Sequence, residues 1–77
     1  MEELLRTIVK DLVNDPDSIT ITSDAPQEDG TVVMHLSVAP DDMGRVIGKQ
    51  GRIAKAIRAV LRAAAGRQNQ KVVLEID

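Results

Sequence analysis

The chain contains no Phe, Tyr or Trp and no cysteine. Any core must therefore be built from aliphatic side chains that recur along helices and strands, because neither a disulfide framework nor a thiolate zinc site can hold the chain together. With 77 residues there is room for one small core, and no room for a second domain or a deep catalytic cleft. We therefore expect residues 1–77 to form one compact domain.

The same composition predicts where the protein works. Absence of cysteine suits a reducing compartment. No apolar run approaches the roughly 20 residues needed to span a bilayer, and Glu2 and Glu3 do not fit the positively charged start of a signal peptide. We expect a cytoplasmic protein without a membrane span.

Hydrophobic spacing predicts three helices. The first carries apolar residues from Leu4 to Val13 and should end near Asn14, because Pro16 disfavours helical geometry in the residue before it. The second is short, starts at Pro40 and ends at Gly48. The third runs from residue 51 to a glycine cap at Gly66. Its expected core residues are Ile53, Ala54, Ile57, Val60, Leu61 and Ala64.

Alternation of apolar and polar residues predicts three strands, over residues 18–23, 31–38 and 71–77. The first two are close in sequence and should pair as an antiparallel hairpin. The second and third are joined through helices and should be parallel, as in a crossover connection. The element order is αββααβ, and the predicted fold is α+β, with a three-stranded mixed sheet and three helices packed on one face.

Charge is distributed unevenly along the chain. Residues 1–42 carry two cations and ten acids, residues 43–71 carry eight cations and no acid, and residues 72–77 carry two acids. The formal net charge of −2 therefore conceals a strongly basic segment. A polyanion meets the local field of one face rather than the average of the chain. Without aromatic rings on which to stack bases, RRM and OB folds are not expected.

The basic segment surrounds Gly48-Lys49-Gln50-Gly51, a four-residue connection between the second and third helices. Glycine permits positive φ and lets another backbone approach closely. A helix that starts near Gly51 directs its positive dipole end towards the loop, which favours phosphate. The loop and its neighbours are the candidate RNA-binding residues: Arg45, Val46, Ile47, Gly48, Lys49, Gln50, Gly51, Arg52 and Lys55.

The Val-Ile-Gly-x-x-Gly core, the basic helix after it and the αββααβ order resemble a KH domain of the type II, bacterial arrangement, over nearly the whole chain. The resemblance implies that about four unpaired nucleotides cross a groove, with their backbone clamped by the GXXG loop. By position, Ile47 and Ile57 are implied as apolar contacts or supports of that groove.

The resemblance also implies partners and a role. It implies self-association, pairing with a larger bacterial KH-containing protein, and an RNA chaperone or post-transcriptional regulator linked to translation, cell shape, cell wall biogenesis, elongation or division. Two alternatives stay open. One is a protein-interaction or ribosome-associated adaptor that uses the fold as a docking platform, and the other is binding of single-stranded DNA.

Other sites are not predicted. The segment lacks the spacing of a Walker A loop, and no nucleophile, base and orienting group can be assembled, so we expect no enzyme and no cofactor. His35 lies in a strand without a second His or any Cys, which favours a solvent-facing or cross-strand role over a metal site. Asp41 and Asp42 are explained as helix-start residues. Arg58 and Arg62 are equally able to bind RNA or to pair with acids of residues 1–42.

Overall fold

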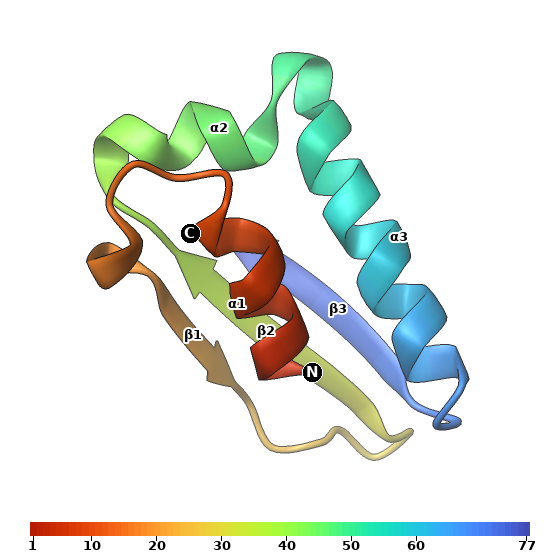
Figure 1. Cartoon of the computed structure of the whole chain (residues 1–77). Helices are drawn as coiled ribbons and strands as arrows, with labels where there is room; N and C mark the ends of the chain where they lie inside the picture. The colour runs from red at the N-terminus through yellow and green to blue at the C-terminus, as the bar shows by residue number, and fades with distance from the viewer.

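A computed structural model describes all 77 residues and confirms the predicted α+β fold, a three-stranded mixed sheet with three helices on one face (Figure 1). The helices are α1 (Glu2–Lys10), α2 (Met43–Ile47) and α3 (Arg52–Gly66), and the strands are β1 (Thr20–Ser23), β2 (Thr31–Ser37) and β3 (Lys71–Ile76). Three short 3₁₀ turns, at Pro16–Ser18, Pro40–Asp42 and Lys49–Gly51, lie between them. No helix combines the length and the apolar character needed to cross a membrane.

The strand order is β1-β2-β3, so β2 is central. β1 pairs antiparallel with β2, and β2 pairs parallel with β3, as predicted. The register sets Thr22 and Glu75 on either side of His35, all three on the face without helices. β3 is an edge strand beside α3 (Figure 1).

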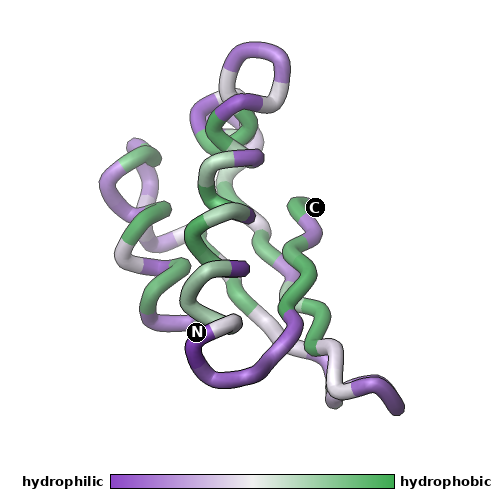
Figure 2. Tube along the Cα trace, turned by 90° about the vertical axis from the view of Figure 1, so that its right-hand side faces the viewer, coloured by the Kyte–Doolittle hydropathy of each residue, from purple (hydrophilic) through white to green (hydrophobic).

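The core lies between the sheet and the helices, which form separate layers when the molecule is viewed from the side (Figure 2). It is wholly aliphatic, as the composition requires. Its ten buried members come from every helix, from β2 and β3, and from the segments just before β1 and just after β2: Leu5, Val9, Ile19, Met34, Leu36, Val38, Val46, Ile57, Leu61 and Leu74.

The first helix ends earlier than predicted, at Lys10 rather than near Asn14. The last helical hydrogen bond runs from the Val13 N–H to the Val9 carbonyl. The next two amides, of Asn14 and Asp15, instead donate to the carboxylate of Asp42, each over 3.1 Å. Asp42 therefore ends the helical path by binding amides that a longer helix would have used.

Asp42 lies at the start of the second helical segment, as predicted, but its side chain has a further role. The side chain makes no capping bond to the helix that follows, and Asp42 is 2% exposed. A buried carboxylate needs partners, and it has the two amides and an ion pair with Arg45, Oδ1 to Nε over 3.5 Å. Asp42 thus joins the segment after α1 to the start of α2.

The first strand also starts later than predicted. The residues after Pro16 form a 3₁₀ turn in which the Ser18 hydroxyl donates to the Asp15 carboxylate over 2.6 Å. Such local side-chain bonds compete with a β ladder. Pairing with β2 therefore begins only at Thr20.

Two predictions for α3 were wrong. Val60 is 46% exposed rather than in the core, whereas Ala64 is half-buried and its neighbour Ala65 is buried. Gly66 does not cap the helix in a left-handed conformation, because α3 continues through it to Arg67. The positive φ of this turn falls on Asn69, at 55°.

Candidate nucleic-acid interface

The loop between α2 and α3 turns the chain with three positive φ angles in four residues. Gly48 has φ 73°, Gln50 58° and Gly51 75°. Left-handed backbone is cheap for glycine, and a single polar residue tolerates it. The Gly51 N–H donates to the Gly48 carbonyl over 3.1 Å, which closes the loop. The two glycines predicted from sequence are therefore required by the local geometry.

The loop presents polar side chains to solvent. Lys49 and Gln50 are exposed between the glycines, and Arg52 and Lys55 are exposed on the first turn of α3. Arg45 is exposed too, although it pairs with Asp42. These groups make the start of α3 cationic, and the helix dipole adds to that potential.

The three apolar residues predicted in or beside the site differ in exposure. Ile47 is 37% exposed and offers an apolar surface beside the loop. Val46 is fully buried, and Ile57 is 3% exposed. Their side chains therefore pack into the core beneath the loop and α3.

Beyond Arg52 and Lys55, the cations of α3 continue towards the edge of the sheet with Arg58 and Arg62. Arg58 and Arg62 line a hollow of about 80 Å³ between α3 and β3, together with Leu61, Val72, Val73 and Leu74. Arg58 donates through Nε to the Leu74 carbonyl over 3.1 Å. Neither arginine forms an ion pair with an acid, so the alternative that they pair with acids of residues 1–42 was wrong.

The opposite side of α3 is apolar. A groove of about 380 Å³ separates α1 from α3 and is lined by Leu4, Ile8, Leu12, Ile53, Ala56, Ile57 and Val60, with Arg52 at its rim. The sequence missed this groove because Val60 was assigned to the core. α3 therefore carries a cationic flank towards β3 and an apolar flank towards α1.

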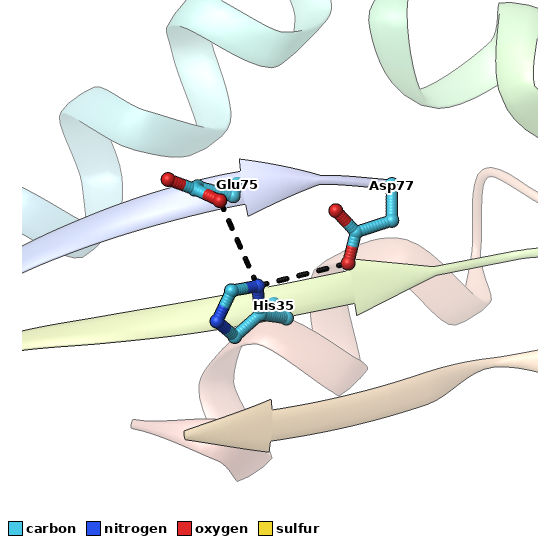
Figure 3. Close-up of side chains that lie close together, drawn as sticks. All are labelled: His35, Glu75 and Asp77. Atoms are coloured by element: carbon cyan, nitrogen blue, oxygen red, sulfur yellow. Dashed lines mark ion pairs between the residues drawn. The ribbon is translucent and has the colours of Figure 1, made fainter. Parts of the chain in front are cut away.

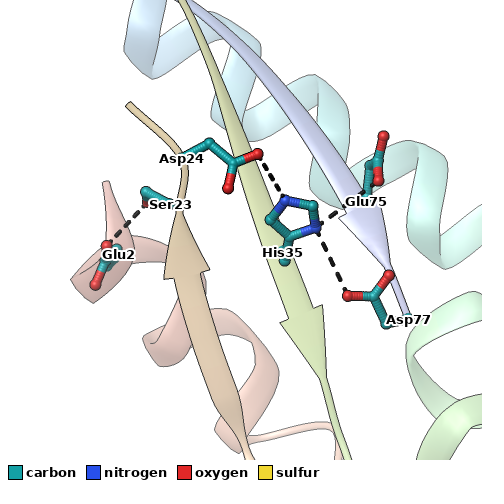
Figure 4. Close-up of polar contacts among 6 residues, drawn as sticks. All are labelled: Glu2, Ser23, Asp24, His35, Glu75 and Asp77. Atoms are coloured by element: carbon teal, nitrogen blue, oxygen red, sulfur yellow. Dashed lines mark hydrogen bonds and ion pairs between the residues drawn. The ribbon is translucent and has the colours of Figure 1, made fainter. Parts of the chain in front are cut away.

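His35 has the cross-strand role that the sequence predicted as one of two options. Its Nε2 lies 3.0 Å from Asp24 Oδ2, and its Nδ1 faces Glu75 and Asp77 on the other side (Figure 4). The hydrogen bond to Asp24 raises the pKa of His35, and the charges of Asp24, Asp77 and Glu75 act in the same direction. The same figure shows the Ser23 hydroxyl donating to Glu2 over 2.9 Å.

The fold has relatives among solved structures. A crystal structure of Aquifex aeolicus Era bound to GDP and AlF₄⁻ superposes with a TM-score of 0.65 at 23% identity, over 96% of this chain and 28% of the Era chain. A structure of Era in complex with MgGDPNP and nucleotides 1506–1542 of 16S ribosomal RNA matches equally well. At this identity the likeness concerns the fold.

Sequence relatives are nearer. The RNA-binding protein KhpA of Clostridium acetobutylicum is 51% identical over 76 residues, which cover 99% of either chain. KhpA of Listeria monocytogenes is 52% identical over 77 residues, 99% of this chain and 97% of the relative. These proteins are named for RNA binding rather than for a reaction, which agrees with the prediction that the chain is not an enzyme.

The family model described as "KhpA/KhpB, KH domain" matches residues 2–76. Together with the full-length relatives and the αββααβ fold, this confirms the resemblance read from the GXXG loop and its flanking helices. The chain belongs to the KhpA/KhpB family of KH domains.

Proposed function

We propose that residues 1–77 act as a single KH domain that binds single-stranded RNA through the Gly48–Gly51 loop. The observation that carries this proposal is the exposure of Lys49 and Gln50 between two glycines of positive φ, at the start of a helix whose exposed charges are all cationic. Relatives of the same length are named RNA-binding proteins, which supports RNA as the polyanion.

In the proposed complex, one set of protein groups contacts the RNA phosphates and another contacts the bases. A phosphate beside the loop meets the Lys49 ammonium, the dipole of α3 and the cations Arg52 and Lys55. Gln50 offers a neutral hydrogen-bond partner. The following nucleotides pass along α3 towards the hollow beside Arg58 and Arg62, where Val73 is 47% exposed. Without aromatic rings, bases there are held by aliphatic contact and hydrogen bonds.

Binding of this kind should be weak and sensitive to salt. A site of about four nucleotides engages roughly three or four phosphates, so the logarithm of the binding constant should fall with the logarithm of salt concentration with a slope of about −2 to −3. Sequence preference should be modest, because phosphate contacts carry no base information.

The experiment that tests the proposal is fluorescence anisotropy of labelled single-stranded RNA, titrated at two or more salt concentrations. The test protein carries Lys49→Glu, and the control carries Arg6→Glu, which changes the net charge equally on the exposed side of α1. We expect the Lys49 variant to bind at least about tenfold more weakly with a shallower salt slope, and the Arg6 variant to bind nearly as the wild type does.

A second variant, Lys49→Asp with Gln50→Asp, should abolish binding while circular dichroism shows an intact fold. An equal loss of RNA affinity in the Arg6 variant would show that net charge alone explains the effect. If neither variant lost affinity, the loop would not be part of the RNA-binding site. Parallel titrations with DNA of the same sequence compare the two nucleic acids, because nothing in the loop itself selects for the 2′-hydroxyl.

We further propose that the domain works as a pair, either with a second copy or with a KhpB-like protein. The apolar groove between α1 and α3 supports this, since Val60 is large, apolar and 46% exposed. Its neighbours Ala56 and Ala59 are exposed and small enough for another helix to approach.

A pair of domains would also bind RNA more tightly than the single loop of one domain. Two linked grooves on one RNA gain through effective concentration without new contacts in either groove. In the cytoplasm such a pair would serve as an RNA chaperone or post-transcriptional regulator linked to cell elongation or division, as the family resemblance implies.

The second candidate function is a protein-interaction or ribosome-associated adaptor, and the apolar groove is the observation that favours it. The two candidates differ in which surface the cell requires. If cells keep normal growth and shape with the Lys49→Asp, Gln50→Asp double variant but not with a change at Val60, the adaptor function is favoured. The opposite result favours RNA binding by the loop.

A further inference from the structure

The face of the sheet opposite the helices holds a cluster that RNA binding does not use. His35 of β2 stands beside Glu75, its partner in the β2–β3 register, and beside Asp77, which follows β3 (Figure 3). The Asp77 N–H donates to the Leu36 carbonyl over 2.8 Å, so the backbone of Asp77 is held by the sheet. All three residues are therefore placed by β-sheet pairing rather than by a free loop.

The potential ligand atoms of these three residues lie close together. Nδ1 of His35 lies 3.8 Å from Glu75 Oε2 and 3.6 Å from Asp77 Oδ2 (Figure 3). The three ligand atoms all lie within 4.8 Å of one another. Two ligands of a tetrahedral Zn²⁺ at about 2.0–2.1 Å are roughly 3.4 Å apart. The two distances from Nδ1 lie slightly above that spacing, and both carboxylates are exposed side chains that can rotate.

Asp24 determines which nitrogen of the His35 imidazole carries the proton. Its Oδ2 lies 3.0 Å from His35 Nε2, and a carboxylate only accepts, so Nε2 carries the proton and donates. In the neutral ring this leaves the lone pair of Nδ1 directed at Glu75 and Asp77. A lone pair that faces two carboxylates requires a proton or a cation between them. Metal-binding histidines commonly donate their second N–H to such a carboxylate.

We propose that His35, Glu75 and Asp77 form a binding site for a divalent transition-metal ion, with Zn²⁺ as the best match, and that Asp24 orients the imidazole. Imidazole nitrogen favours Zn²⁺ and its neighbours over Mg²⁺ or Ca²⁺. Two carboxylates and a neutral imidazole balance the charge of the ion, and water completes its coordination. The sequence argument against a metal considered only His and Cys, whereas here two of the three ligands are acids, one in β3 and one directly after it.

The bound ion would join β2 to β3 at the end where both strands finish. It would lie on the face of the sheet opposite the helix layer that carries the Gly48–Gly51 loop (Figure 1). The site is therefore independent of the RNA proposal, and its test does not need RNA.

The experiment is isothermal titration of ZnCl₂ into untagged, chelator-treated protein, with Co²⁺ absorption as a spectroscopic check on coordination. The expected result is one ion per chain for the wild type. His35→Gln, Glu75→Gln and Asp77→Asn should each weaken binding at least about tenfold, and Asp24→Asn by about tenfold through the orientation of the ring. The matched control is Glu28→Gln, an exposed acid of the β1–β2 connection, which should bind as the wild type does.

Circular dichroism of each variant checks the fold, which these exposed side chains should leave unchanged. Absence of a stoichiometric heat, or Zn²⁺ binding that survives His35→Gln, overturns the proposal. Equal weakening in the Glu28 variant does so too, because it would reveal diffuse attraction to acids. NMR of the wild type adds a positional readout, since Zn²⁺ should shift the amides of residues 35, 75 and 77 before those of the Gly48–Gly51 loop.

Discussion

Gly48 and Ile53 are so close that a side chain at position 48 has no room. A Cβ built on Gly48 would lie 2.6 Å from Ile53 Cγ1 and 2.9 Å from the backbone nitrogen of Ile53. The second glycine of the loop has no such neighbour, because a Cβ on Gly51 would meet nothing within 4 Å. Both glycines have positive φ, but only the first is also required by packing against α3.

Gly48→Ala should therefore lower the free energy of unfolding by about 2–4 kcal/mol, from left-handed strain plus the clash with α3. Gly51→Ala should lower it by only about 1–2 kcal/mol, from strain alone. Urea denaturation of both variants measures the difference. Equal losses would show that packing against Ile53 has no energetic weight.

Alanine at Gly44 or Gly66 should stabilise the fold, in contrast to alanine at Gly48 or Gly51. Both lie within helices without positive φ, and a Cβ at either would meet nothing within 4 Å. Alanine in a compatible helical position stabilises by about 0.5–1 kcal/mol. Thermal unfolding should show a raised midpoint for Gly44→Ala and for Gly66→Ala. A lowered unfolding midpoint for Gly66→Ala would instead support the capping role that the sequence predicted for Gly66.

Asp42 should be the acid that matters most for stability. Asp42→Ala leaves the amides of Asn14 and Asp15 without their acceptor and should cost about 2–4 kcal/mol, since hydrogen bonds to charged groups are the stronger kind. The exposed neighbour is the control, and Asp41→Ala should change stability by less than about 0.5 kcal/mol. Urea denaturation distinguishes them, and a small loss at position 42 would contradict the anchoring role.

Asp29 should titrate below its ordinary range. Its Oδ1 accepts the Thr31 N–H over 2.9 Å, and this bond is the main cause of a lowered pKa. A carboxyl with a lowered folded pKa contributes stability that is present above the unfolded value of 3.8 and is lost as pH falls through the folded pKa. NMR titration of the side-chain carboxyl should give a midpoint below 3.8. In Asp29→Asn this part of the acid dependence of stability should disappear, and a midpoint at or above 3.8 would contradict the prediction.

Val60 and Val73 form a matched pair for the proposed self-association, since they are 46% and 47% exposed. Val60 lines the groove between α1 and α3, whereas Val73 lines the hollow beside β3. Val60→Asp should weaken self-association at least about tenfold in analytical ultracentrifugation, and Val73→Asp should leave it unchanged. A wild type that stays monomeric at high concentration, or equal effects at both positions, would count against the groove as the contact surface.

The sequence was sufficient for the element order because that information is local. Apolar residues at helical or alternating spacing mark each element, and a helical crossover between two adjacent strands favours parallel pairing. The loop was equally readable. Gly48 and Gly51, with cations between and after them, indicate a phosphate-binding loop within a few residues of sequence. The structure adds the φ angles and the close approach of Gly48 to Ile53.

What the sequence could not decide were relations between distant segments. Val60 sits near the edge of the apolar face of α3, and only the position of α1 leaves it in a groove rather than in the core. Asp42 has the sequence context of a helix start, yet the two amides that donate to it lie 27 and 28 residues earlier. His35 meets Asp24, Glu75 and Asp77 because strand register brings four separate positions together.

The sequence by itself thus determined the family, the order of helices and strands, and the cationic glycine loop, because periodicity and motif chemistry act over a few residues. Only the tertiary structure decided which apolar residues stay exposed, which acid anchors the first helix and which acids surround His35. Those outcomes depend on burial and on cross-strand register, which are properties of packed pairs of elements rather than of any one segment.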